Sequence, residues 1–326
     1  MVLLVSSESD QSTSNVIMYL LRDKKKYFRL GEAQSIYGLS VNLQDETENS
    51  IEIEAGGMKI DLKDITSLWF RKRGIDLFGM FDVDYQTNNK ELNIHLKKNI
   101  KQSELKTVQE YIYYKLNNKP HLGNYKIGDA NKLISFEIAK ECGLQIPSTI
   151  VSSAMKNLQN FEANHTPIMS KAIQDVFDHV DQPTNTYYGS LNKLVKNLQD
   201  EKDERIFPSA LQAYVDKQVE LRIFYLKGKF YSMAIFSQSN KKTKIDFRNY
   251  DDDKPNRCVP YNLPKSIEDK LRLFMSRVEL FTGSIDMILT NNDEYVFLEV
   301  NPVGQYGMVS VPCNYHLDEL IANELI

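Results

Sequence analysis

The sequence predicts a mixed α/β fold, and three observations support this prediction. Short apolar runs typical of strands alternate with a helix-like stretch in the first hundred residues. Paired apolar runs at 218–237 and 284–301 are typical of β-hairpins. The 326 residues are 42% hydrophobic and 26% charged, as in ordinary globular domains, and are enough for two or three domains.

The first expected domain, residues 1–120, is a small α/β domain. Its apolar start at 2–6 is typical of a buried strand, and a helix is expected at 12–22. A segment rich in turn-forming residues at 117–124 marks the first domain boundary. The other elements expected in this domain are strands near 27–30, 50–54, 58–62 and 65–70 and a helix at about 103–116.

Two further domains are expected, a central one at 121–210 and a C-terminal one at 211–326. The central domain should begin with a helix that is capped by Asp129 and runs to Cys142, where Gly143 ends it. Polar residues dominate 174–209, whose role the pattern does not define, and 238–264, which is expected to be a loop. The other expected elements are strands near 148–152, 167–173, 218–226 and 230–237, a turn at 227–229, a helix at 266–281 and a hairpin at 284–301.

The composition excludes several classes of protein. A net charge of -4 argues against general nucleic-acid binding, which needs a surplus of Lys and Arg. Neither a membrane span nor a signal peptide is expected, because no apolar run is long enough and the chain has no basic start. The three cysteines are odd in number and far apart, so they predict neither a disulfide framework nor a Cys-based zinc site and favour the cytoplasm.

The strongest chemical pattern lies in the last hairpin. A two-residue turn at Asn292 and Asp293 would set Asp286 directly opposite Glu299. Because side chains alternate along a strand, Asn301 would share the face of Glu299. The opposite, apolar face would carry Ile285, Met287, Leu289, Val296, Leu298 and Val300.

This pattern predicts a magnesium site. Two carboxylates opposed in a sheet repel each other, and a hard cation removes that cost. Mg²⁺ in ATP sites is usually held by few protein oxygens, with phosphates and waters completing its shell. The alternative from the residues alone is an exposed polar hairpin face whose strand simply ends at Asn301 and Pro302.

Several charged residues upstream are open to two interpretations. Lys171 lies in a mostly apolar strand, where it either extends to solvent or meets an anion, and Lys132 lies near a helix N-terminus, where the dipole disfavours it. Gln218, Glu220 and Arg222 would share one strand face, either as a surface ion-paired row or as contacts to ribose and phosphate.

Taken together, these segments resemble the ATP-grasp superfamily over nearly the whole chain. The ordered set is Lys132 in "NKLISFEIAKECGLQIPST", Lys171 in "IMSKAI", then "LQAYVDKQVELRIF", Asp286 in "GSIDMIL", and "FLEVNPVGQY". Within the superfamily the chain looks most like the graspetide maturases, or microviridin-type ligases, and among them the grasp-with-spasm branch. The segments behind this last likeness are 69–74, 244–264 and 298–310.

The resemblance implies an ATP-grasp fold with an N-terminal pre-ATP-grasp domain and ATP between the central and C-terminal domains. It also implies a role for each matching residue. Lys132 and Lys171 would contact the nucleotide, Gln212, Tyr214 and Val215 would line the adenine, and Glu220 would bind the ribose. Arg222 and Arg248 would stabilise the transferring phosphate, and Asp286, Glu299 and Asn301 would hold magnesium, expected as two ions. Arg71, Arg73 and Arg257 would face the substrate, although Lys72 separates two arginines that are adjacent in the family.

The implied activity is an ATP-dependent ligase that joins Asp or Glu side chains of a ribosomal precursor peptide to Thr, Ser or Lys side chains. Expected partners are a precursor with a leader, a SPASM-type companion protein and a second copy of the chain. Two alternatives stay open: a small-molecule ligase similar to glutathione synthetase or a glutamate-adding ligase, and a non-catalytic peptide-binding scaffold. We also expect 174–209 to help hold the leader, and the loop from Lys241 to Pro264, with Arg248, to close as a lid.

Overall fold

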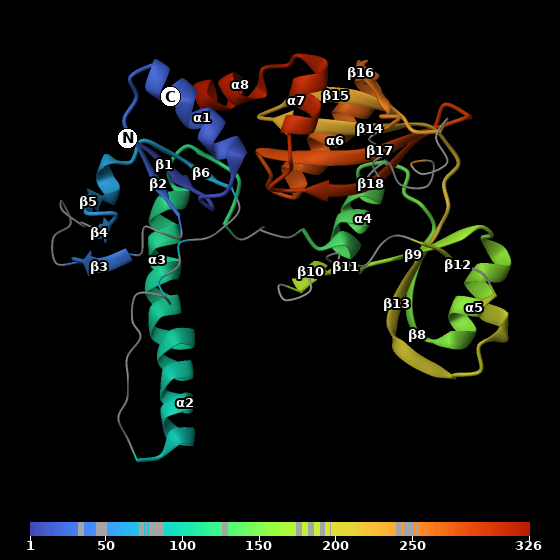
Figure 1. Ribbon diagram of the computed structural model, residues 1–326, viewed down its shortest axis with the longest axis horizontal. Coiled ribbons are helices and arrows are strands. Elements are labelled where there is room, and N and C mark those ends of the chain that lie inside the picture. The colour runs from blue at the N-terminus through green and yellow to red at the C-terminus, as the bar shows by residue number, and fades with distance from the viewer. Residues whose placement is uncertain are drawn as a thin grey trace. The chain divides into compact units, whose positions relative to one another are not determined.

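The structure, a computed structural model, has the mixed α/β architecture that the sequence predicts (Figure 1). It forms two compact units. Unit 1 comprises Met1–Gly128, Gln305–Ser310 and His316–Ile326, and unit 2 comprises Asp129–Gly304 and Val311–Tyr315. The sequence did not indicate that the C-terminal segments rejoin the first unit. The residues described are 1–31, 36–43, 51–71, 75, 77, 88–125, 130–173, 178–181, 186–189, 193–195, 197–238, 243, 251 and 253–326.

Unit 1 is built on a parallel sheet in the order β2-β1-β6-β7. Every residue of β1 and β6 is buried, which suits central parallel strands covered on both faces. The expected strands at 2–6, 27–30 and 65–70 are therefore confirmed. The four strands are β1 (Val2–Val5), β2 (Tyr27–Leu30), β6 (Ser67–Phe70) and β7 (His121–Leu122).

Helix α1 (Gln11–Arg22) begins at a buried polar cap. The Asp10 carboxylate accepts hydrogen bonds from the Thr13 backbone N–H at 3.1 Å and the Thr13 hydroxyl at 2.6 Å. It also pairs with the Arg71 guanidinium, with Nε at 3.1 Å from Oδ2. The cap thus ties the start of α1 to the end of β6. Helix α8 (Leu317–Glu324) lies beside α1, and Arg22 Nη1 is 2.6 Å from Glu319 Oε1 (Figure 1).

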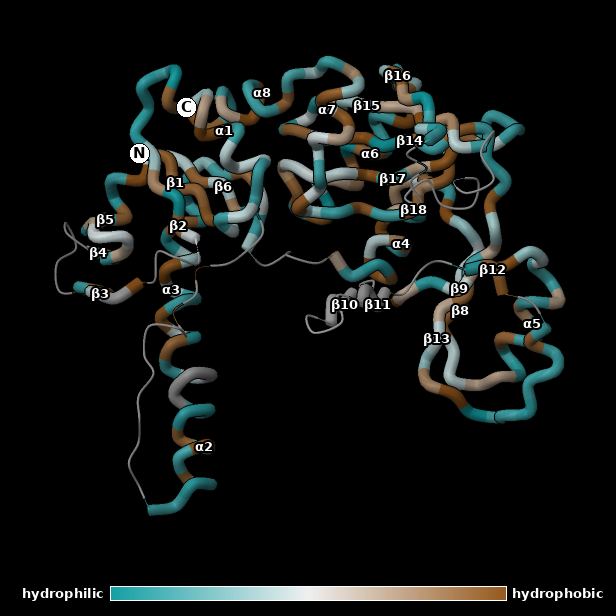
Figure 2. The backbone as a smooth tube through the Cα atoms, viewed as in Figure 1, coloured by the Kyte–Doolittle hydropathy of each residue, from teal (hydrophilic) through white to brown (hydrophobic). Residues whose placement is uncertain are grey.

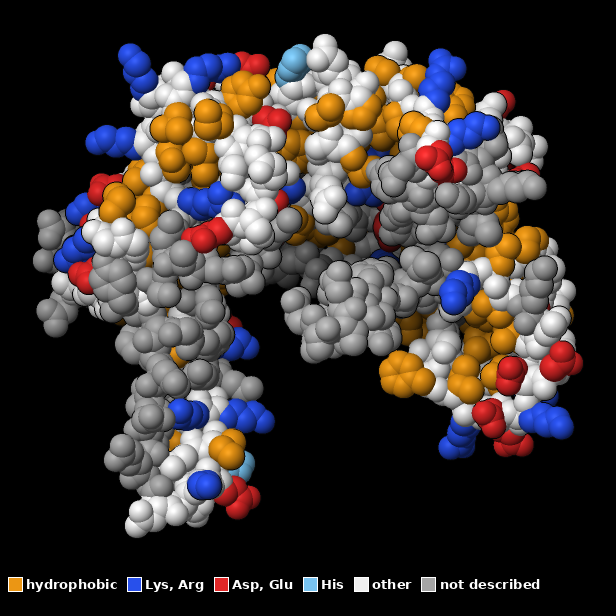
Figure 3. All heavy atoms as spheres, viewed as in Figure 1, with side chains coloured by type: hydrophobic (Ala, Val, Ile, Leu, Met, Phe, Trp, Pro, Cys, Tyr) orange, Lys and Arg blue, Asp and Glu red, His pale blue; other side chains and the backbone are white. Residues whose placement is uncertain are grey.

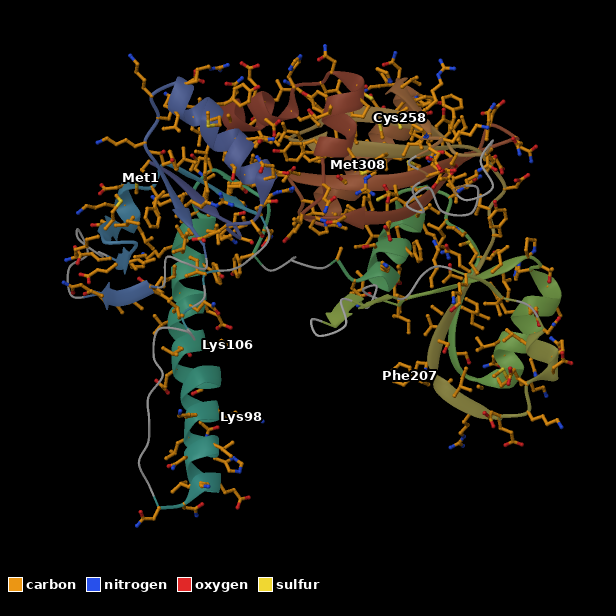
Figure 4. The ribbon with its side chains drawn as sticks, in the orientation of Figure 1. Met1, Lys98, Lys106, Phe207, Cys258 and Met308 are labelled. Carbon is orange, nitrogen blue, oxygen red and sulfur yellow. The ribbon has the colours of Figure 1, made fainter. Side chains whose placement is uncertain are left out.

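Strand β3 and helix α2 of unit 1 were not predicted, and neither were the short strand β7 and helix α8. None of the residues of α2 is buried, and its tube is mostly hydrophilic with a few hydrophobic positions, so no buried apolar stripe marks this helix (Figure 2). It continues through a π-helix, Ile100–Leu105, into α3; Figure 4 labels Lys98 on α2 and Lys106 at the start of α3. The remaining elements are β3 (Ile36–Val41), β4 (Ile51–Ala55) and β5 (Met58–Asp61) in an antiparallel sheet, the 3-10 helix Leu62–Asp64, α2 (Lys90–Asn99) and α3 (Lys106–Asn117).

Unit 2 contains a four-stranded sheet in the order β12-β9-β13-β8. Helix α5 packs on it through Leu158, which joins Ile168 and Leu211 in a small core. Hydrophobic side chains gather over β8, β13 and α5 in the space-filling view (Figure 3). The elements of this region are β8 (Thr149–Ala154), α5 (Met155–Asn164), β9 (Ile168–Lys171), the hairpin of β10 (Asp178–Asp181) and β11 (Thr186–Gly189), β12 (Lys193–Val195), the 3-10 helix Leu198–Asp200 and β13 (Arg205–Ala213).

A second, antiparallel sheet of unit 2 has the order β16-β15-β14-β17-β18. On one face, Phe297 of β18 contacts Phe136 of α4 and Phe274 of α6, with ring centroids at 6.3 and 4.9 Å. The two helices therefore cover this face and leave the other to the polar residues. The elements are α4 (Lys132–Glu141), β14 (Lys217–Leu226), β15 (Lys229–Phe236), β16 (Arg257–Tyr261), α6 (Lys265–Arg277), β17 (Thr282–Thr290) and β18 (Tyr295–Asn301). Helix α7 (Gly307–Cys313) belongs to unit 1 up to Ser310 and to unit 2 beyond it.

Three local predictions for unit 2 were wrong. Strand β16 occupies part of the segment expected to be a loop at 238–264, because it pairs with β15 as an edge strand. Helix α6 ends at Arg277 rather than 281. Asn131, not Asp129, caps α4, since its side chain accepts from the N–H groups of residues 133 and 134; Asp129 lies outside the described residues. The expected stop at Gly143 is confirmed by its φ of 76°, which suits glycine.

In unit 1, Arg71 is buried with aromatic neighbours. Its guanidinium carbon lies 5.4 Å from the Trp69 ring centroid and 5.2 Å from that of Tyr306. The Tyr306 hydroxyl donates to Asp318 at 2.7 Å, and burial of the phenol, with the nearby carboxylate, raises its pKa. Tyr306 thereby fixes the returning segment within this unit.

We expect Arg71→Met to destabilise unit 1 by about 3 kcal/mol, because it leaves the buried Asp10 carboxylate without its cationic partner. Urea unfolding followed by circular dichroism measures this loss. Arg22→Met is the matched control, since the Arg22 side chain is half exposed and should matter little. Equal midpoints for the two variants would show that the buried pair does not hold the unit together.

Candidate functional site

Three neighbouring strands of the second sheet carry a row of charged side chains. Arg222 on β14 is opposite Asp286 on β17, and Asp286 is opposite Glu299 on β18. Arg222 Nη1 lies 2.7 Å from Asp286 Oδ1, and both side chains are mostly buried. The predicted pairing of the two carboxylates is therefore present, and an arginine neutralises one of them.

The predicted pairing of Asp286 with Glu299 is present, but the turn that produces it differs from the one predicted. Thr290 and Glu294 close a three-residue turn through the Thr290 N–H and the Glu294 carbonyl at 2.9 Å, so the expected two-residue turn is wrong. A bulge in β18 beside Asp286 compensates for the extra residue, because Met287 is opposite Phe297. The bulge also places Val296 opposite Ile288, on the face of the carboxylates rather than on the expected apolar face.

Lys132 completes the row from the start of α4. Its Nζ is 3.5 Å from Glu299 Oε2, and both side chains are about one-third exposed. A lysine at a helix N-terminus opposes the helix dipole, and the pairing with Glu299 offsets part of that cost. The row therefore has two adjacent carboxylates, Asp286 and Glu299, with a cation at each end, Arg222 and Lys132.

Asn301 follows the row but has a different local role. Its Oδ1 accepts from the N–H groups of Val303 at 3.0 Å and Gly304 at 2.9 Å, forming a turn. Gly304 has a φ of 37°, and an added Cβ would lie 2.6 Å from the Ser284 backbone nitrogen. Because both lone pairs of the Asn301 oxygen serve the turn, metal ligation by Asn301 would require its side chain to rotate.

At the start of β14, the predicted position of Gln218 is wrong, and Lys217 lies near Glu220 although the sequence pattern did not indicate it. A bulge at Gln218 sets Lys217 opposite Thr290 and Val219 opposite Leu289. Gln218 is exposed, so its predicted place beside Glu220 is wrong. Lys217 instead reaches Glu220, with Nζ 2.7 Å from Oε1. In a regular strand, residues three positions apart point to opposite faces. Lys217 and Glu220 can therefore pair only because the bulge shifts the alternation between them.

Of the predicted adenine residues, Gln212 lies near the end of β13, and Tyr214 and Val215 lie between β13 and β14. Gln212 is buried, and its Nε2 donates to Thr149 Oγ1 at 3.0 Å. The Tyr214 N–H donates to the Pro167 carbonyl at 2.9 Å. Tyr214 and Val215 line a cavity of about 770 Å³, together with 143–147, parts of the β17–β18 turn and four other residues.

The other predicted site residues are distributed more widely. Lys171 is half-buried on β9, opposite Ala210. Arg257 is exposed on β16, with its guanidinium carbon 5.5 Å from the Phe236 ring centroid. Arg71 is buried in unit 1, as described above. Arg73 and Arg248 lie outside the described residues, so the proposed lid arginine stays a prediction.

The described part of the chain contains neither a cluster of metal-binding side chains nor a helix that could span a membrane. The residues described there form no cluster of three or more His, Cys, Asp or Glu side chains that could hold a metal. None of the helices described is both long and apolar enough to cross a bilayer.

Comparison with solved structures identifies the fold. The chain is 25% identical to the macrocyclase MdnC from Microcystis aeruginosa, solved with the precursor peptide MdnA; the match covers 99% of this chain and 98% of that one at a TM-score of 0.73. A RiPP-associated ATP-grasp ligase from Chryseobacterium gregarium, solved with ADP and a leader and core peptide, matches at 20% identity and a TM-score of 0.75, over 99% and 94% of the two chains. The chain has the fold of the ATP-grasp ligases. No family model and no curated protein matches the sequence.

The fold match extends to more distant ATP-grasp ligases. PsnB, solved with a minimal precursor, Mg and ADP, is 12% identical and matches at a TM-score of 0.71 over 99% of this chain and 96% of PsnB. At that identity the likeness concerns the fold alone. The expectation of an ATP-grasp fold resembling the graspetide maturases is confirmed, whereas the individual site residues stay predictions.

We expect Asp286→Asn and Glu299→Gln each to lower ligation about a hundredfold while leaving the melting temperature nearly unchanged. Each change keeps the size of the side chain but removes the charge that faces the row. Ligation rate and melting temperature measure the two effects. Glu137→Gln on the exposed face of α4 is the control and should match the parent. Parental ligation rates in both site variants would refute the metal assignment.

Proposed function

We propose that this chain is an ATP-dependent peptide macrocyclase. It would activate Asp or Glu side chains of a ribosomal precursor peptide and couple them to Thr or Ser hydroxyls or Lys amines. The observation that carries the proposal is the pair of opposed carboxylates on β17 and β18, flanked by cations, within a fold that matches a precursor-bound macrocyclase along its whole length.

The reaction would take two steps. A peptide carboxylate attacks the γ-phosphorus of ATP, forming an acyl phosphate and releasing ADP. A hydroxyl or amine of the same peptide then attacks the acyl carbon, phosphate leaves, and the proton of the nucleophile passes to solvent or phosphate. The protein's contribution is to position the groups and to offset negative charge as it is redistributed.

The charge row suits this task because its cations can change partners. In the structure, Arg222 pairs with Asp286 and Lys132 with Glu299, so the row is close to neutral. When ATP is bound, Arg222, Lys132 and Lys171 would contact phosphate oxygens, and a guanidinium can hold two such oxygens at once. Arg248 would add a second guanidinium.

The two carboxylates fit a magnesium ion by donor chemistry. Carboxylate oxygens with phosphates and waters are the ligands that Mg²⁺ prefers, and Asp286 and Glu299 are directly opposed. When bound, the ion would neutralise phosphate charge. Asn301 would join these ligands only after its side chain leaves the turn. PsnB has been solved with Mg and ADP, which supports the binding of Mg²⁺ together with an adenine nucleotide here.

The base and ribose would bind beside the link between β13 and β14, residues 214–216, which is called the hinge below. Gln212, Tyr214 and Val215 would contact the adenine edge; because the Tyr214 N–H is already bonded, Val215 would supply the backbone donor. Glu220 is buried on the same strand as Arg222, two residues nearer the hinge, and would accept from the ribose.

The resemblance to graspetide maturases supports finer proposals about the assembly. These are two magnesium ions, a homodimer, a SPASM-type companion protein and location in the cytoplasm. We also propose, on the same resemblance, that Arg73 and Arg257 contact the substrate. The burial of Arg71 favours a positioning role for that residue. Sedimentation of the purified enzyme would test the dimer, and a monomer at micromolar concentration would contradict it.

The leader of the peptide would contact the segment 174–209. On its described part, Leu194 and Phe207 are exposed hydrophobic residues at 37% and 86%, and Phe207 points outward from β13 (Figure 4). Exposed aromatic side chains on an otherwise polar segment favour a docking surface. The C. gregarium ligase has been solved with a leader peptide, which supports a leader for this enzyme as well.

We expect the enzyme, with Mg-ATP and the precursor encoded beside its gene, to release one ADP and remove one water from the peptide for each ring. Mass spectrometry of the peptide and a coupled ADP assay measure both. Phe207→Ser should raise the KM for the full precursor and leave kcat nearly unchanged.

Exposed Lys156→Ser on α5, outside 174–209, serves as the control for the surface change and should leave KM unchanged. ADP release that is independent of peptide, or ligation only of free amino acids, would contradict the macrocyclase proposal. An unchanged KM in Phe207→Ser would refute the leader contact alone.

A further inference from the structure

A buried ion pair lies beside the predicted ribose ligand. Lys217 and Glu220 are exposed by only 4% and 7%, and Lys217 Nζ is 2.7 Å from Glu220 Oε1. Ser237, at the end of β15, also donates to Oε1, at 2.8 Å. One oxygen of the Glu220 carboxylate thus accepts from two buried donors on two different strands.

The bulge at Gln218 makes this arrangement possible. In a regular strand, Lys217 and Glu220 would point to opposite faces. The extra residue between the pairs Lys217–Thr290 and Val219–Leu289 turns Lys217 onto the face of Glu220 and Arg222. The chain thereby places a cation beside the carboxylate immediately after the hinge residues.

We propose that Lys217 and Ser237 are positioning residues that orient Glu220 for a ribose and so make the site selective for ribonucleotides. The proposal rests on the ATP-binding role proposed above. It extends that role by naming the residues that set the preference for the sugar.

Two physical effects support this assignment. A buried carboxylate tends to take up a proton, and Lys217 opposes this by stabilising the charged form. An ionised carboxylate offers only acceptors, which is what a sugar hydroxyl needs, whereas a protonated one loses part of that capacity. Two donors on Oε1 also fix the plane of the carboxylate, because rotation would break both bonds.

The competing interpretation is that the pair only secures the start of β14. A structural role of that kind would weaken binding of every nucleotide by the same factor, because it would disturb the whole hinge. Orientation of Glu220 would instead affect only nucleotides that have sugar hydroxyls. The ratio of the two affinities therefore separates the interpretations.

Calorimetric titration of the full-length enzyme with Mg-ATP and with Mg-2′,3′-dideoxy-ATP, without peptide, tests the proposal. The parent should bind ATP about tenfold more tightly than the dideoxy form, since hydrogen bonds to a charged group are lost. Lys217→Gln should weaken ATP binding about tenfold and dideoxy-ATP binding less than twofold. Ser237→Ala should act in the same direction with a smaller change, and it keeps the test valid if the lysine variant does not fold.

The matched control is Gln218→Ala, which alters the exposed neighbour in the same bulge and should preserve the parental ratio. Equal weakening of both nucleotides, or an unchanged ratio in both variants, would overturn the positioning role while leaving the macrocyclase proposal intact. A parent that binds ATP but does not discriminate would also overturn it. A parent that binds neither nucleotide would contradict the proposed function itself.

Discussion

Two acidic side chains held directly opposite each other in one sheet are the constraint on which the site depends. Asp286 and Glu299 repel, and the sheet prevents them from separating. The protein balances them with Arg222 from β14 and Lys132 from α4. These cations come from different elements, so the five-stranded sheet and the preceding helix must pack correctly before the site is neutral.

Aromatic packing on the opposite face of the five-stranded sheet fixes the helices against it. Phe297 anchors α4 and α6 on the apolar face, and the bulge in β18 permits Phe297 to face inward although it is only two residues from Glu299. A second bulge, at Gln218, turns Lys217 toward Glu220. Each bulge moves a side chain to the face that regular alternation would deny it, as bulges near functional sites often do.

Sequence reasoning was sufficient wherever an apolar period was regular. The strands β1, β6, β14 and β17 followed from short apolar runs, and the opposition of Asp286 to Glu299 followed from alternation and an approximate turn. The errors arose where extra residues changed the register, as with Val296 and Gln218. Helix α2 escaped prediction because none of its residues is buried, and β16 because pairing with β15 stabilises a polar edge strand. The Lys132–Glu299 and Arg71–Asp10 pairs join distant parts of the chain, so local spacing could not reveal them.

The central claim is that the carboxylate row holds a divalent cation together with ATP. Electron paramagnetic resonance of Mn²⁺, used in place of Mg²⁺, measures this directly, because binding broadens the signal of the free ion. The account predicts saturable Mn²⁺ binding by the parent enzyme with ATP that exceeds binding by ATP alone, and loss of the excess in Asp286→Asn/Glu299→Gln. Retention of the excess binding by that double variant would contradict the account.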